Sequence, residues 1–161
     1  MASKPATTLY ELLKRQARRL PDATAIAAPG SVPLTYSGLL RYVNYIHTGL
    51  RSYGINHNDS VAIILPNGAQ MAVAFLGVSS YCASAPLSME HKREEYDYFL
   101  SRLQAKAIIV QTKSETPAIL VAKSRGILVI ELKTGSKKLA GDLSFEVNDL
   151  ATTDNTDLVQ S

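Results

Sequence analysis

The chain has 161 residues, enough for one hydrophobic core and too few for a large multidomain enzyme. Its composition, with 46% hydrophobic and 19% charged residues, excludes a disordered, collagen-like or coiled-coil protein. The net charge of +3 is unevenly spread: residues 131–161 hold three basic and six acidic residues, so the body is basic and the tail acidic.

The sequence also indicates the compartment and the kinds of partner to expect. The single cysteine, Cys82, excludes a disulfide framework and suits a reducing compartment. No apolar run reaches the roughly 18 residues that span a bilayer, and residues 1–5 contain no apolar signal core, so a soluble, cytoplasmic protein is expected. The cations within residues 14–19 are not interleaved with aromatic residues, which predicts a solvated helix face and no nucleic-acid binding.

The first third of the chain predicts helices around a short hairpin. Apolar residues recur at spacings of three and four within residues 8–20, where Thr8 and Glu11 have capping-box spacing. Short apolar runs on either side of a Pro-Gly turn at 29–31 predict a hairpin. The next helix is expected to start at Thr35 and to end before Gly54.

From Asp59 onward, short apolar runs alternate with helical segments, which is typical of βαβ units. We expect an α/β fold in residues 1–133, with a parallel sheet and flanking helices. Residues 134–161 are expected to form a polar linker with one weak strand or turn at 143–147. Strands are predicted at 61–65, 83–87, 107–110 and 127–132, and helices at 71–82, 94–103 and 117–124.

No group of side chains forms a catalytic or metal-binding pattern. The three histidines are scattered singly, and Cys82 follows an apolar helix, which predicts a packed thiol rather than a nucleophile. Residues 134–138 resemble part of a phosphate-binding loop, but they lack its glycines and the helix that should follow. The sequence therefore identifies no catalytic residue and no metal ligand.

The turn at residues 66–68 is better placed to meet a ligand, because open parallel sheets bind ligands beyond the carboxyl ends of their strands. The competing interpretation is that Asn67 only caps the following helix, with Gln70 three residues later. On these residues alone the chain is an α/β domain of unknown use. A flavodoxin-like or receiver-like domain stays open, although the strand at 61–65 does not end in the aspartates of a receiver.

Several consecutive segments resemble the N-terminal region of the adenylate-forming acyl-CoA synthetases, the superfamily that includes luciferases and peptide-synthetase adenylation domains. Each segment is a weak signal alone, but their order and spacing agree over residues 8–132. Within the superfamily, the resemblance is to oxalate–CoA ligase-like enzymes. The segments are residues 34–37, 53–55, 59–68, 83–88, 94–100 and 105–110.

This resemblance implies a two-step acid–thiol ligase. A carboxylate attacks ATP to give an acyl-adenylate and pyrophosphate, and the thiol of coenzyme A then takes the acyl group. ATP, Mg²⁺ and CoA are accordingly the implied cofactors of the full-length enzyme, with oxalate as a candidate acid. The family's phosphate-binding loop, acidic magnesium-associated motif, ribose-binding aspartate and C-terminal lysine have no match here, so we expect an inactive N-terminal fragment that by itself binds no cofactor.

The family places this region near the entrance for the acid and CoA, which implies weak candidate contacts. Lys113 follows a predicted strand, where a basic side chain would meet a CoA phosphate. A peroxisomal location is possible for the full-length form, but residues 159–161 are no such signal. The candidates are Asn67, Ser88, His91 and Lys113.

Two departures from the family pattern concern helix starts. Gly38 stands where relatives place Glu, which weakens the helix that begins at Thr35. Lys92 is a poor N-cap, and Ser88 is the alternative cap for the helix at 94–103. The functional alternative is a non-catalytic α/β module that binds a partner or regulates a relative. Self-association through the apolar helix at 71–82 is expected in either case.

Overall fold

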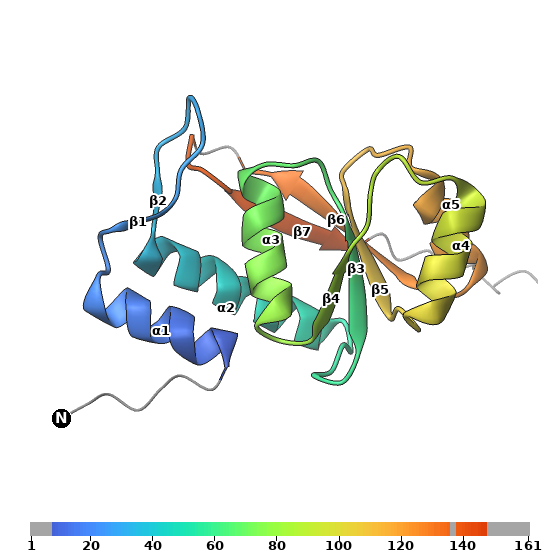
Figure 1. The fold of residues 1–161 in the computed structure, drawn as a ribbon, viewed down its shortest axis with the longest axis horizontal. Helices are drawn as coiled ribbons and strands as arrows, with labels where there is room; N and C mark the ends of the chain where they lie inside the picture. The colour runs from blue at the N-terminus through green and yellow to red at the C-terminus, as the bar shows by residue number, and fades with distance from the viewer. Residues whose placement is uncertain (1–7, 136–137, 148–161) are drawn as a thin grey trace, which may run out of the picture.

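The computed structural model describes residues 8–135 and 138–147, and it is built around a five-stranded sheet with helices on both faces (Figure 1). The strand order is β4-β3-β5-β6-β7. The first four of these strands in that order are parallel, and β7 runs antiparallel to β6, which confirms the expected βαβ sheet. The strands are β3 (Ser60–Ile64), β4 (Ala83–Pro86), β5 (Ala107–Gln111), β6 (Leu128–Thr134) and β7 (Leu143–Val147).

Helices cover the two faces of this sheet unequally. One face packs against α1 (Leu9–Arg19), α2 (Tyr36–Ser52) and α3 (Ala69–Ser79), and the other against α4 (Arg93–Arg102) and α5 (Pro117–Ser124) (Figure 1). Alternate residues of each strand point to opposite faces, so Val61 and Ile63 join the first core while Ala62 and Ile64 join the second. The predicted hairpin is present as the antiparallel pair β1 (Thr24–Ile26) and β2 (Leu34–Thr35).

The strand order matters for function. Counted from β3, it is the 2-1-3-4-5 order of doubly wound α/β sheets, except that the last strand is antiparallel. In such sheets the chain leaves β3 for one side and later returns to the other side with β5. The carboxyl ends of β3 and β5 therefore mark the point at which these folds bind ligands.

The helix starts confirm two predicted caps and correct two others. The Oγ1 atoms of Thr8 and Thr35 accept hydrogen bonds from the N–H groups of Glu11 and Gly38, both at 3.1 Å. Asn67 is not a cap, because α3 starts after Gly68 and no side chain caps it. The prediction failed by one residue, since the turn after β3 places Asn67 ahead of the cap position.

Ser88 does not cap α4 either. Its Oγ accepts a hydrogen bond from the N–H of Glu90 (3.1 Å) and so closes a tight turn inside the loop. The N-cap of α4 is Lys92, whose own N–H donates to Oε2 of Glu95 at 2.7 Å. The first turn thus compensates for a poor cap with an acidic side chain three residues later.

The folded unit extends past the predicted boundary at residue 133. Leu143–Val147 is a strand of the central sheet, paired along its length with β6, and Leu143 and Phe145 are buried in the core beneath α2. This part of the predicted linker is therefore structural. The phosphate-loop-like string overlaps residues 136–137, which lie outside the described residues, as do residues 148–161.

The apolar helix α3 is covered on its inner side only. Val73, Ala74 and Val78 are buried, and Gly77 lies so close to α2 that an added Cβ would be 2.3 Å from Cδ1 of Ile46. On its outer side Phe75 is 38% exposed. No helix in the described ranges combines the length and the apolar character needed to cross a bilayer.

Candidate functional site

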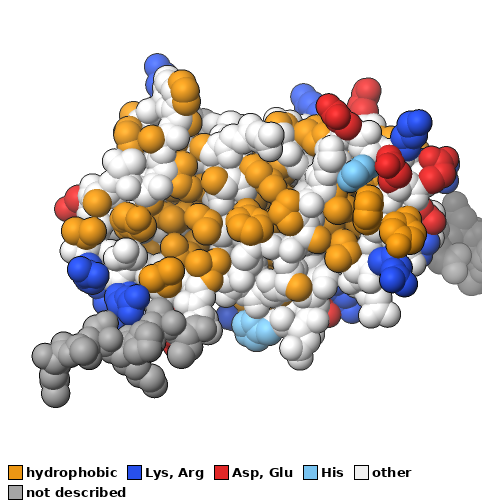
Figure 2. Space-filling model, viewed as in Figure 1, with side chains coloured by type: hydrophobic (Ala, Val, Ile, Leu, Met, Phe, Trp, Pro, Cys, Tyr) orange, Lys and Arg blue, Asp and Glu red, His pale blue; other side chains and the backbone are white. Residues whose placement is uncertain are grey.

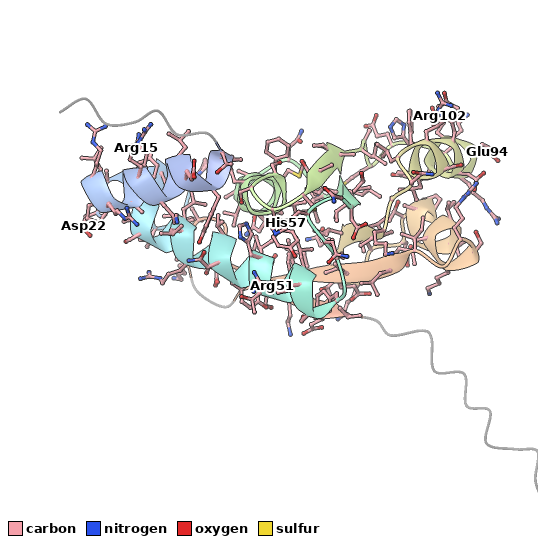
Figure 3. The ribbon with its side chains drawn as sticks, turned by 90° about the horizontal axis from the view of Figure 1, so that it is seen from below. Arg15, Asp22, Arg51, His57, Glu94 and Arg102 are labelled. Carbon is pink, nitrogen blue, oxygen red and sulfur yellow. The ribbon has the colours of Figure 1, made fainter. Side chains whose placement is uncertain are left out.

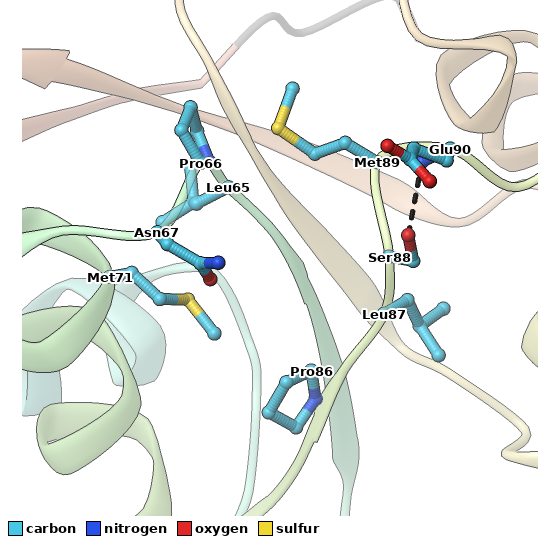
Figure 4. Close-up of a pocket in the computed structure, with 9 residues that line it drawn as sticks. All are labelled: Leu65, Pro66, Asn67, Met71, Pro86, Leu87, Ser88, Met89 and Glu90. Carbon is cyan, nitrogen blue, oxygen red and sulfur yellow. Dashed lines mark hydrogen bonds between the residues drawn. The ribbon is translucent and has the colours of Figure 1, made fainter.

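A pocket of about 410 Å³ lies at the carboxyl ends of β3 and β4 (Figure 4). One wall is the turn after β3 and the start of α3, and the other is the loop between β4 and α4. The figure shows Asn67 and Met71 projecting from the first wall toward the segment that carries Leu87 and Ser88. The lining residues are Leu65, Pro66, Asn67, Met71, Pro86, Leu87, Ser88, Met89 and Glu90.

The loop wall is held in place from α4. The fully buried Tyr96 donates from its hydroxyl to the backbone carbonyl of Ser88 at 2.7 Å. Together with the turn between Ser88 and Glu90, this bond fixes the backbone on one side of the pocket. The hydroxyl of Ser88 is occupied as an acceptor from Glu90 but keeps its proton to donate.

A smaller pocket of about 100 Å³ adjoins the first at the topological switch point of the sheet. It is formed by the carboxyl ends of β3, β5 and β6, and it includes Gln111 and Thr134. Leu65, Pro66 and Asn67 line both pockets, so the turn after β3 separates them. Asn67 therefore occupies the position at which a doubly wound sheet is expected to meet its ligand.

The other two sequence candidates lie outside these pockets. His91 packs against the rings of Tyr96 and Phe99, and its Nδ1 is 3.7 Å from Oε2 of Glu95. Lys113 is exposed in the turn after β5, where its φ of 61° places it in the left-handed region. The structure thus brings Asn67 and Ser88 together and leaves His91 and Lys113 apart from them.

The chemistry of the lining limits what it can hold. Neither pocket is lined by Lys or Arg, and Glu90 is the charged residue of the larger one, so a triphosphate or a CoA phosphate would meet no positive side chain. Among the described residues, no cluster of three or more His, Cys, Asp or Glu side chains is arranged to hold a metal ion. These two pockets suit an uncharged chain with both polar and apolar groups, and neither is lined for a triphosphate.

Sequence reasoning missed the two methionines of the larger pocket. Met71 belongs to the predicted apolar helix and Met89 to the loop that carries the candidates Ser88 and His91, and the two side chains line one cavity. Their position in the sequence could have identified them, because each methionine follows the end of a parallel strand by a few residues. Flexible thioether side chains are suited to contact ligands of varied shape.

The remaining reactive groups are structural. Cys82 is buried, and desolvation, reinforced by the charge of Asp59, raises the pKa of its thiol to about 11, so that it stays protonated at neutral pH. His47 lies between α2 and α3, where its Nε2 is 2.8 Å from Oγ of Ser80 and 3.1 Å from the carbonyl oxygen of Gly77. The burial of Cys82 agrees with the prediction of a packed thiol.

The fold is a doubly wound α/β domain, and its candidate cleft lies at the carboxyl ends of β3, β4 and β5. The sequence model of the AMP-binding enzyme family matches residues 13–158, and the chain belongs to that family. The match begins at α1 and runs past β7, which places β7 within the family's fold.

Individual relatives agree with this assignment. A probable CoA ligase of Humulus lupulus is 33% identical over 121 residues, which cover 74% of this chain and 23% of the relative. Oxalate–CoA ligases of Arabidopsis thaliana and Saccharomyces cerevisiae are 30% and 32% identical, over 69% of this chain in each case and 22% and 23% of their own lengths. The chain thus spans about a quarter of these relatives.

A solved structure supports the same conclusion. The structure of a putative long-chain-fatty-acid CoA ligase from Rhodopseudomonas palustris superimposes with a TM-score of 0.70 at 25% identity, covering 83% of this chain and 34% of that one. The resemblance to the N-terminal region of adenylate-forming enzymes is confirmed.

Proposed function

We propose that this chain forms the N-terminal part of an ATP-dependent carboxylate–CoA ligase. The observation that carries the proposal is the pocket at the carboxyl ends of β3 and β4, in a chain whose relatives include CoA ligases. In that role Asn67 and Ser88 contact the acid or the pantetheine arm of CoA, and ATP, Mg²⁺ and the CoA phosphates are bound by other parts of the enzyme. The enzyme would work in the cytoplasm or the peroxisome.

Oxalate is the proposed acid, because relatives from a plant and a yeast are named oxalate–CoA ligases. The pocket itself does not suit oxalate, since a dianion beside Glu90 would have no positive partner among the lining residues. Its mixed lining, which sets Asn67 and Ser88 beside Leu65, Met71 and Leu87, suits the pantetheine arm better, because that arm carries both amides and methylene groups. We therefore assign the pocket to the thiol substrate and the choice of acid to residues elsewhere in the enzyme.

The chain alone is proposed to be inactive. Purified protein should show only background ATP–pyrophosphate exchange with oxalate and with short and medium fatty acids. Robust exchange with any of these acids would contradict the proposal, because the family's ATP-binding motifs have no match in this chain.

The role of the pocket is best tested in a fusion. The full 161-residue chain replaces the matched residues of the S. cerevisiae oxalate–CoA ligase, and formation of the CoA thioester is followed. Asn67→Ala and Ser88→Ala should each raise the KM for CoA several-fold with little change in kcat, whereas the control Lys123→Ala, at an exposed residue of α5 outside both pockets, should change neither. If all the substitutions changed the KM for CoA equally, the pocket would have no specific role in binding CoA.

The second candidate function is a non-catalytic module that regulates a full-length relative. Phe75 favours this second function, because its large apolar side chain is partly exposed on the apolar helix α3. Such a surface can bind a folded partner. Adding the purified chain to an active relative discriminates the two: a regulator changes the rate at stoichiometric amounts, and an enzyme fragment leaves it unchanged.

A further inference from the structure

The turn after β3 carries the single Asn-Gly pair of the sequence, Asn67 followed by Gly68. Both residues are exposed, and Asn67 lines both pockets. Asparagine is among the thermally labile residues. It is most labile before glycine, because glycine has no Cβ to obstruct the approach of the asparagine side chain to the next backbone nitrogen. The turn therefore combines a reactive pair with access to water.

The two groups that would react are unrestrained. Neither the side-chain amide of Asn67 nor the N–H of Gly68 has a hydrogen-bond partner among the described residues. The helix α3 begins at Ala69, so the peptide that joins Asn67 to Gly68 lies outside its hydrogen-bonded turns. A Cβ built on Gly68 would meet no atom within 4 Å. The peptide can therefore rotate without breaking a hydrogen bond or meeting a neighbour.

We propose that Asn67 deamidates in the folded protein. The backbone nitrogen of Gly68 attacks Cγ of Asn67, and the bond between Cγ and Nδ2 breaks. Nδ2 leaves as ammonia, with the proton that the Gly68 nitrogen gives up. Water then opens the succinimide ring at either of its carbonyl carbons and returns a proton to that nitrogen. The product is an aspartate or an isoaspartate at position 67, formed by uptake of water and loss of ammonia.

The product places a carboxylate where the molecule has little charge. Figure 2 shows hydrophobic side chains across the middle of one face, over α3, with no Lys, Arg, Asp or Glu in the centre. Charged side chains lie toward the ends of the molecule, such as Arg15 on α1 and Arg102 on α4 (Figure 3). No Lys or Arg lines either pocket, so the new carboxylate would share the larger one with Glu90 and have no cationic partner there. Deamidation thus makes an uncharged corner of both pockets acidic, and this chemistry needs only the present chain, whatever its function.

The chain provides matched internal controls. Asn56 and Asn58 are exposed like Asn67, but the residues that follow them carry side chains. They flank His57, which is labelled in Figure 3. Trypsin releases all three asparagines in one peptide, residues 52–92, so their rates can be measured together. A difference among them therefore reports the following residue and not exposure to water.

The test incubates the purified 161-residue chain in mildly alkaline, heavy-oxygen water and follows this peptide by tandem mass spectrometry. Deamidation at Asn67 should increase with time, incorporate heavy oxygen and make the protein a substrate for an isoaspartyl methyltransferase. Asn56 and Asn58 should react several-fold more slowly. The rate at Asn67 in the folded protein should lie within several-fold of the rate in the same chain unfolded in guanidinium chloride. Asn67→Gln should remove the reaction at this position, because glutamine must close a larger ring.

Three results would overturn the inference. A folded protein that reacts at Asn67 slower than the unfolded chain by orders of magnitude would show that the fold keeps Cγ away from the Gly68 nitrogen. Equal rates at Asn67, Asn56 and Asn58 would show that the glycine has no special role. A product that contains aspartate without isoaspartate would show direct hydrolysis of the side chain, with no ring closure.

Discussion

The hydroxyl of Tyr42 donates a 2.5 Å hydrogen bond to Oδ1 of Asp142, joining α2 to the segment before β7 across 100 residues of chain. Asp142 is 7% exposed. Burial of Tyr42, aided by its bond to Asp142 and by the negative charge there, raises the pKa of the phenol to about 12. The contact anchors a segment that the sequence alone assigned to a linker.

Replacing Tyr42 by Phe should destabilise the protein by about 1–3 kcal/mol, because the buried carboxylate of Asp142 loses a donor. Urea unfolding measures the change. Tyr98→Phe is the matched control. Tyr98 is 59% exposed, so the loss of its hydroxyl should leave no buried group without a hydrogen bond. Equal stability of the two variants would show that the Tyr42 bond contributes nothing net.

The raised pKa of Tyr42 also predicts a loss of stability in alkali. In the unfolded chain this phenol loses its proton near pH 10, and in the folded protein at about 12, so above pH 10 the folded state holds the extra proton. The free energy of unfolding should therefore fall between pH 10 and 12. Tyr42→Phe should make this fall shallower, and an unchanged slope in that variant would contradict the assignment.

Gly77→Ala should destabilise the protein by about 1–3 kcal/mol, although alanine favours helices, because the new methyl group would collide with Ile46 at the contact of α2 and α3. Gly49→Ala is the control in α2: its Cβ would lie 3.4 Å from the Phe145 ring, at the edge of ordinary contact. That variant should be neutral or more stable by up to about 1 kcal/mol. Thermal unfolding of both proteins checks the prediction, and a stabilised Gly77→Ala would show that the helices can separate at little cost.

His47 should make the protein less stable in acid. Burial between α2 and α3 lowers the pKa of its imidazole below the ordinary value, and the nearby His57 and Arg51 act in the same direction, against the hydrogen bond to Gly77. Below pH 6.5 the unfolded chain therefore binds a proton that the folded protein resists, so stability is complete above that pH and falls as the pH drops toward the folded pKa. His47→Gln should flatten the dependence of the urea midpoint on pH between 7 and 5, whereas His91→Gln, outside this contact, should preserve it.

Local patterns in the sequence determined most of the elements. Spacings of three and four predicted α1 and α2 with their threonine caps, and the apolar runs at 61–65 and 107–110 predicted β3 and β5, because periodicity and capping act between neighbours in the chain. The order and spacing of the segments that resemble the family were enough to indicate it, and the match of the family model over residues 13–158 confirmed it.

The tertiary structure decided what depends on distant partners. Leu143–Val147 is a weak strand by its own sequence and becomes part of the sheet because the edge of β6 and the buried side of α2 are there to receive it. One interpretation of the sequence made Asn67 a helix cap. In the structure it lines a pocket instead, because the β4–α4 loop lies opposite it. Helices form from contacts within a few residues, whereas pockets and sheet edges form from segments brought together by the whole fold.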